Sequence, residues 1–365
     1  MKRVRLNVFC CSVIAGLLAG CATSVDNLAI NYHADLVAQQ VNEQSLLSGD
    51  KKLNIQYLGV GGYLFQYGED SIMTAPSFTN PGLINVTLPL SIEPDTDLVD
   101  KLLPAHAKQA EFILVGHAHY DHLMDVPYIM QQHMPEATAV GSTTMTNIVT
   151  AVIEDARLLD ISDYAAVGQQ PGKWVYNRNN TIRFMPIKSD HAPHFMGIKV
   201  MSGKYEDALT ELPSTAYGWK EGQTYAYVID FLDIQQQPIY RIHYQDAASN
   251  SPDGLMPVMA DSKVNSKVNS KAVDMAILCV AAFHQVDDYP EAILQQTQPR
   301  TIVLGHWEDF FDNNSFDNNS VDNQNIPVKG VRMTNIDDFI QRVEAVKADD
   351  ATAVLPAPFS WIQAY

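Results

Sequence analysis

The stretch Gly116-His117-Ala118-His119-Tyr120-Asp121-His122 brings three histidines and an aspartate together in one short segment. Imidazole nitrogens and carboxylate oxygens are common ligands of divalent metals. The run before it, Phe112-Ile113-Leu114-Val115, is continuously apolar, as in a buried parallel strand, and residues 123–132 have helical periodicity. Because open α/β sheets bind ligands outside the carboxyl ends of their strands, the stretch predicts a metal site on a strand-to-helix loop. The alternative is a helix start with solvated histidines.

The same order of strands and helices is predicted twice along the chain. Antiparallel strands and then strand-helix units are expected in each half, at 53–73, 112–132 and 137–149, and again at 181–187, 225–231, 239–244, 275–296 and 301–304. The glycines between residues 58 and 63 are interpreted as a turn between two strands. Two polar tandem duplications, at 262–271 and 311–320, predict exposed loops.

The N-terminus has the layout of a secretory signal peptide. Basic residues come first, an apolar run too short to span a membrane follows, and Leu18-Ala19-Gly20-Cys21 ends the segment. These four residues resemble the lipobox of bacterial lipoproteins, which implies cleavage before Cys21 and a lipid on that cysteine. We therefore expect a signal peptide over 1–20 and a tether over 21–50. The resemblance favours the outer membrane, and the alternative is a plain cleaved signal.

Composition excludes some classes of protein and partner. The 365 residues are 46% hydrophobic, enough to bury a large core. The formal net charge of -18 disfavours nucleic acid as a partner, because affinity for a phosphate backbone depends on Lys and Arg. After Cys21, Cys279 alone remains, so no intrachain disulfide is expected. Cys279 lies in an apolar run and is predicted to be an inert core residue.

The pattern His117-x-His119-x-Asp121-His122 resembles the signature of metallo-β-lactamase-fold hydrolases. The resemblance extends over about residues 51–365, which we predict to be one domain. It implies an α/β fold, a four-layer αβ/βα sandwich, with a dinuclear metal site at the edges of the sheets. The run His119-Tyr120-Asp121-His122-Leu123 is more similar to the branch of phosphodiesterases and lactonases that includes N-acyl-phosphatidylethanolamine phospholipase D.

The resemblance also implies further metal ligands at later strand ends. His191 follows the strand that ends at Ile187 and matches the third histidine of the family, with His194 as its competitor. Asp246 follows the strand 239–244 and matches the aspartate that bridges the metals, and His306 matches the last histidine. One metal would be held by His117, His119 and His191, the other by Asp121, His122 and His306, with Asp246 between them.

The chain also departs from the family. Many members carry Asp-Pro after the early strands, where this chain has Thr74-Ala75-Pro76. An aspartate that often supports the site from behind is therefore missing.

Nitrogen and oxygen ligands without a thiolate suit two zinc ions, with Fe or Mn as alternatives. A hydroxide between two such ions is a nucleophile at neutral pH, because coordination brings the pKa of water from about 15.7 to near 7. We predict a metal-dependent hydrolase of an ester, lactone, amide or phosphodiester, acting on a small molecule or a lipid. Asp121 or Asp246 would carry the proton, and the predicted substrate pocket includes His194, His284 and Trp307. The alternatives are a lipid-anchored metal-binding protein without turnover and a phospholipase D-like phosphodiesterase.

Overall fold

The computed structural model of the protein describes residues 37–38, 52–194, 196–258, 272–311 and 328–364. The predicted signal peptide and Cys21 lie outside these residues, as does almost all of both polar duplications. Within the predicted tether, Val37–Ala38 forms strand β1, which pairs with β15 (Trp361–Gln363) near the C-terminus. None of the helices in the described ranges is long and apolar enough to cross a bilayer.

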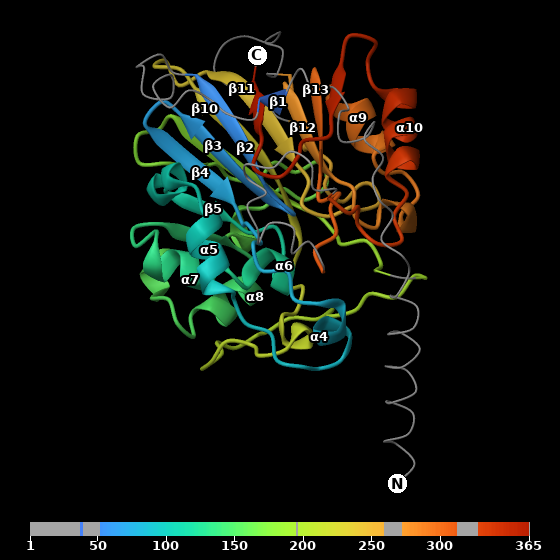
Figure 1. Cartoon of the computed structure of the whole chain (residues 1–365). Coiled ribbons are helices and arrows are strands. Elements are labelled where there is room, and N and C mark those ends of the chain that lie inside the picture. Colours follow the sequence, from blue (N-terminus) through green and yellow to red (C-terminus); the bar gives the residue numbers. More distant parts are fainter. Residues whose placement is uncertain (1–36, 39–51, 195, 259–271, 312–327, 365) are drawn as a thin grey trace.

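Two mixed sheets form the centre of the described structure (Figure 1). In both, an antiparallel half continues into a parallel half. The first sheet runs in the spatial order β1, β15, β2 (Leu53–Gly59), β3 (Gly62–Tyr67), β4 (Asp70–Thr74), β5 (Phe112–Leu114), β6 (Thr138–Gly141) and β7 (Leu158–Asp160). The second runs in the order β14 (Thr352–Val354), β13 (Thr301–Gly305), β12 (Met275–Cys279), β11 (Pro238–Tyr244), β10 (Tyr225–Leu232), β9 (Ile182–Lys188) and β8 (Val175–Tyr176).

Helices cover the outer side of each sheet (Figure 1). The first sheet is accompanied by α4 (Leu83–Thr87), α5 (Thr96–Leu102), α6 (Tyr120–Leu123), α7 (Val126–Gln132) and α8 (Thr143–Val149). The second is accompanied by α9 (Glu291–Thr297) and α10 (Ile336–Val346). Short 3-10 helices η2 to η6 lie in the connections, at Ala105–Gln109, Asp155–Arg157, Ser162–Tyr164, Ala216–Gly218 and Phe283–Gln285. The order helix, sheet, sheet, helix confirms the predicted four-layer αβ/βα sandwich.

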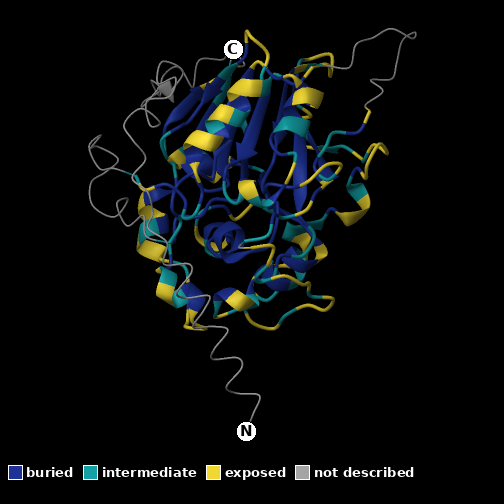
Figure 2. Ribbon diagram, turned by 90° about the vertical axis from the view of Figure 1, so that its right-hand side faces the viewer, coloured by how far each residue is buried: buried dark blue, intermediate teal, exposed yellow. Residues whose placement is uncertain are grey.

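Strands β3, β4 and β5 in the middle of the first sheet are buried on both faces, because alternate side chains enter different cores. On β5, Phe112 and Leu114 join the cluster that reaches the second sheet, whereas Ile113 packs among the helices α5, α7 and α8. Figure 2 shows the result: the strands are buried, and the outer helices have exposed residues on one side. The continuous apolar run read from the sequence is therefore explained.

Three details of the sequence prediction can be compared with the structure. The turn between β2 and β3 holds the glycines, as predicted, and Cys279 is buried in β12. The helix after the histidine motif begins earlier than predicted. Tyr120 to Leu123 already form α6, so Asp121 and His122 lie in a helix rather than in the loop.

A buried ion pair lies in the antiparallel half of the second sheet. The side chains of Asp230 and Arg241 are completely buried and are joined by hydrogen bonds of 2.6 and 2.8 Å. Arg183 adds bonds of 2.7 and 2.9 Å to the same carboxylate and lies over the ring of Trp174. The buried carboxylate on β10 is thus paired with a guanidinium group from each neighbouring strand, as a buried charge requires.

The stability of this sheet should fall in acid because of His243 on β11. Burial lowers the pKa of His243 to about 4, from an ordinary value of about 6.5. Between these pH values the unfolded chain binds a proton that the folded chain excludes, so the stabilisation is present above pH 6.5 and is lost as the pH falls. Between pH 7 and pH 5 this loss amounts to about 2 kcal/mol.

Urea unfolding of the wild type and of His243→Leu at both pH values measures this loss. The variant should lose about 2 kcal/mol less than the wild type over this interval. His106→Leu, in η2 outside the sheets, is the matched control and should behave as the wild type does. An identical acid response in His243→Leu and the wild type would show that this imidazole is not the source.

Candidate metal centre

The loop after β5 and the first turn of α6 carry four of the predicted ligands. His117 and His119 lie in the loop, and Asp121 and His122 lie in α6, which begins directly after His119. All four residues are buried. The buried strand β5 therefore ends at the site, and the helix turns the last two side chains toward the same point.

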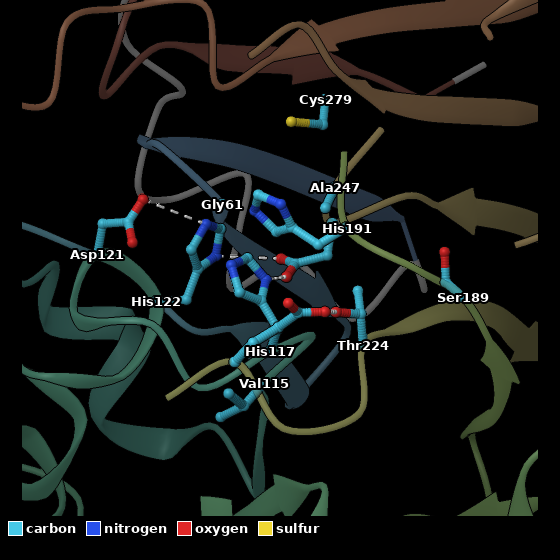
Figure 3. Close-up of polar contacts among 12 residues, drawn as sticks. Gly61, Val115, His117, Asp121, His122, Ser189, His191, Thr224, Ala247 and Cys279 are labelled. Atoms are coloured by element: carbon cyan, nitrogen blue, oxygen red, sulfur yellow. Dashed lines mark hydrogen bonds and ion pairs between the residues drawn. The ribbon is translucent and has the colours of Figure 1, made fainter. Parts of the chain in front are cut away.

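Three histidines form one group of possible ligands. The ligand atoms of His117, His119 and His191 lie within 4.8 Å of one another. Their ring centroids are separated by 4.6, 4.7 and 5.1 Å. His191 comes from the segment after β9, so the second sheet completes a group that begins in the first (Figure 3).

A second group lies on the other side of His117. It consists of His117, Asp121 and His122, whose ligand atoms also lie within 4.8 Å of one another. His306 follows β13 in the second sheet, and its Nε2 atom lies 3.5 Å from Oδ2 of Asp121. The same Asp121 oxygen lies 3.6 Å from Nε2 of His122 (Figure 3).

Asp246 lies between these two groups. Its Oδ2 atom is 2.5 Å from Nδ1 of His117, and its Oδ1 atom is 3.2 Å from Nδ1 of His122. One carboxylate oxygen therefore contacts His117, a predicted ligand of the first ion, and the other contacts His122, a predicted ligand of the second. The structure thus brings all seven predicted ligands together.

The chemistry of these side chains fits a metal. Nε2 of His117 and His119 and Nδ1 of His306 are buried and make no hydrogen bond within the described ranges. Buried polar atoms are almost always paired, so such atoms suggest a ligand. Burial lowers the pKa values of His117, His119 and His191, which keeps these rings neutral, as metal ligands must be.

The two carboxylates, Asp121 and Asp246, are held in their charged form by their neighbours. Burial would raise the pKa values of Asp121 and Asp246, but His122 and other neighbouring histidines hold both well below the usual range. Burial opposes protonation of His122, yet Asp246 and Asp121 raise its pKa to about 9. A metal that binds His122 must therefore displace a proton. Three imidazoles on one side and a mixed set on the other, without a thiolate, suit zinc, with iron or manganese as alternatives.

No protein-family profile matches the chain, and no curated protein is similar to it in sequence. Solved structures are similar to it at low identity. The metallo-β-lactamase fold protein YhfI from Bacillus subtilis is 13% identical over 86% of this chain and 100% of its own, with a TM-score of 0.46.

Two further structures have similar scores. The diiron β-hydroxylase CmlA from Streptomyces venezuelae is 11% identical over 86% of this chain and 55% of its own, with a TM-score of 0.48. Yeast PDE1 is 9% identical over 86% and 100%, with a TM-score of 0.44. Identities this low do not transfer an activity from one protein to another.

Tyr244 and Thr74 support the site from behind, and sequence reasoning did not identify either role. The Tyr244 hydroxyl lies 2.5 Å from Oδ1 of Asp246 and 2.8 Å from the carbonyl oxygen of Gly61. Thr74 donates to the same carbonyl at 2.6 Å and accepts from the amide of Tyr63 at 2.8 Å. Thr74 stands in the segment where the family resemblance suggested a missing aspartate, and its hydroxyl fixes the turn that packs on His122.

Glu308 and Tyr57 support His306 in a similar way. Both side chains are buried, and the Tyr57 hydroxyl lies 2.7 and 2.6 Å from the two carboxylate oxygens of Glu308. The amide of His306 donates to the Tyr57 oxygen at 3.0 Å, and Val60 donates to Glu308. His306 has a φ of 52°, a strained conformation for a residue other than glycine. These bonds help to hold it there.

The predicted pocket residues have three different surroundings. His194 lies beside the cluster, with its ring 5.3 Å from that of His119, and burial lowers its pKa to about 4. Trp307 is buried in the core, and its indole N–H donates to the carbonyl of Pro356. His284 is exposed on η6, where it contacts Phe283, and in the described chain it is not brought together with the seven ligands.

Gly116 should be required for the metal centre. A Cβ atom at this position would lie 2.1 Å from both Cγ and Oδ2 of Asp246, so Gly116→Ala must displace that carboxylate. We expect zinc affinity to fall by about 10-fold to 100-fold, the usual effect of disturbing groups around metal ligands. A competitive titration with a zinc-binding dye measures this.

Gly82→Ala is the matched control, because a Cβ at Gly82 would meet nothing within 4 Å. It should bind zinc as the wild type does. Equal affinities of Gly116→Ala and Gly82→Ala would contradict the importance of the close approach between Gly116 and Asp246.

Proposed function

We propose that the protein is a metal-dependent hydrolase that uses two divalent ions, with zinc as the expected metal. The single observation that carries this proposal is the position of Asp246. One carboxylate oxygen contacts His117, which belongs to the group of three histidines. The other contacts His122, which lies beside Asp121 and His306. A carboxylate in this position suits a ligand shared by two ions.

The residues divide the chemical work as follows. His117, His119 and His191 would hold one ion, Asp121, His122 and His306 the other, and Asp246 would lie between them. When bound, the two ions would supply a water of lowered pKa and would polarise the oxygen of the bond to be cleaved. Asp121 lies 3.6 Å from His122 and 3.5 Å from His306, whose positions hold its pKa well below the usual range. Asp121 or Asp246 would carry the proton to the leaving group.

Esters, lactones, amides and phosphodiesters are the substrate classes that this chemistry supports. In each class an attack by water places negative charge on an oxygen, which two cations stabilise. The net charge of -18 makes a polyanionic substrate such as RNA the least suitable of the phosphodiesters. Small molecules and lipids remain as the substrates to be tried.

Zinc content and hydrolysis should be lost together when the shared ligand is removed. We expect about two zinc ions per wild-type chain and hydrolysis of at least one class in a panel of esters, lactones, β-lactams, phosphodiesters and phospholipids. Asp246→Ala and His119→Ala should lower kcat/KM by at least about 100-fold, because both variants remove a group that holds an ion. Elemental analysis and kinetics on the same samples measure both quantities.

His133→Ala is the control, since His133 pairs with Asp100 elsewhere on the chain. It should keep both zinc and activity. A zinc-loaded wild type that is inert toward every class would instead indicate a metal-binding protein without turnover. Full activity in both ligand variants would refute the proposed centre.

We also propose that the protein is anchored in the cell envelope, in the outer membrane, by a lipid on Cys21. The support comes from the sequence alone: the basic start, the short apolar run and the Leu18-Ala19-Gly20-Cys21 box. In a bacterial host, the wild type should incorporate a labelled fatty acid and remain in the membrane fraction. Cys21→Ser should do neither. Equal labelling of both proteins would contradict the anchor.

A further inference from the structure

Two neighbouring histidines, His191 and His194, compete in sequence for one role in the site. Their rings stack with centroids 4.7 Å apart and planes inclined by 15°. The His119 ring lies 5.1 Å from one and 5.3 Å from the other. Distance to His119 therefore does not show which of the two is the metal ligand. The hydrogen bonds of their Nδ1 atoms distinguish them.

The backbone fixes His191 in the form that a metal requires. Nδ1 of His191 lies 2.6 Å from the carbonyl oxygen of Ala192. A carbonyl oxygen only accepts, so Nδ1 must carry the proton. Nε2 then has its lone pair free, which is the form of histidine that binds a metal through Nε2.

The backbone fixes His194 in the opposite form. The amide of Val200 donates to Nδ1 of His194 at 3.3 Å, and the amide of His194 donates to the carbonyl of Ile198 at 2.9 Å. An amide N–H only donates, so Nδ1 must be the acceptor. In the neutral ring the proton is then on Nε2, which cannot bind a metal without losing the bond to Val200.

Nε2 of His194 has no hydrogen-bond partner among the described residues, and the side chain is only partly buried. An ion pair between Lys199 and Asp190 joins the chain on the two sides of His194. Its ring thus presents an N–H donor beside the group of three histidines.

We infer that His194 is a hydrogen-bond donor to the substrate and not a metal ligand. The acceptor is the carbonyl or phosphoryl oxygen of the bond to be cleaved, on which negative charge develops. This inference rests on the proposed hydrolase function. A donor placed for such an oxygen lowers the barrier of the chemical step more than it strengthens substrate binding.

Metal content and tautomer test the inference without any substrate. His194→Ala should keep the zinc content of the wild type, whereas His191→Ala should lose about one ion. In the metal-free protein labelled with nitrogen-15 histidine, NMR should show the proton on Nε2 of His194 and on Nδ1 of His191. Loss of zinc in His194→Ala, or a proton on Nδ1 of His194, would overturn the inference.

Kinetics on the substrate found in the panel complete the test. His194→Ala should lower kcat by about 100-fold to 1000-fold with little change in KM, and His194→Gln, which keeps an N–H donor, should recover part of the loss. An active wild type matched by His194→Ala overturns this inference alone. A zinc-loaded wild type that is inert on the panel overturns the proposed function, and this inference with it.

Discussion

The carboxylate of Asp246, from the second sheet, lies 2.5 Å from His117 of the first sheet and 3.2 Å from His122. This buried contact joins the ligands of the first sheet to those of the second, and neighbouring residues hold the carboxylate in place. Gly116 leaves room for the carboxylate, and Tyr244 bonds to it. Without the opposing histidines, a carboxylate buried at this depth would be unpaired and costly.

Local patterns predicted the strands and the first four ligands, whereas the resemblance to metallo-β-lactamase-fold hydrolases supplied the four-layer arrangement and the three later ligands. Apolar runs mark strands, and polar residues directly after them mark the sheet edge. The supporting residues depend on contacts between distant segments, which a single sequence does not reveal. Tyr57 forms a hydrogen bond with Glu308, which is 251 positions away in the chain, and the sequence around either residue gives no sign of the contact.

The residues after β13 show the same limit at a finer scale. His306 and Trp307 are adjacent, yet one faces the metal centre and the other fills the core. His191 and His194 differ through the backbone groups that meet their rings, a carbonyl in one case and an amide in the other. A residue type indicates what a side chain can do, and the backbone around it selects one of those abilities.

The division of the ligands between the sheets links the metal to folding. His117 and Asp246 are 129 residues apart, and His306 follows later still. A chain under synthesis therefore has no complete site until its second sheet is in place. Bound ions stabilise only the finished fold, since a preformed site rarely exists in an unfolded chain. A shortage of the proposed metal would thus shorten the lifetime of the folded protein as well as lower its activity.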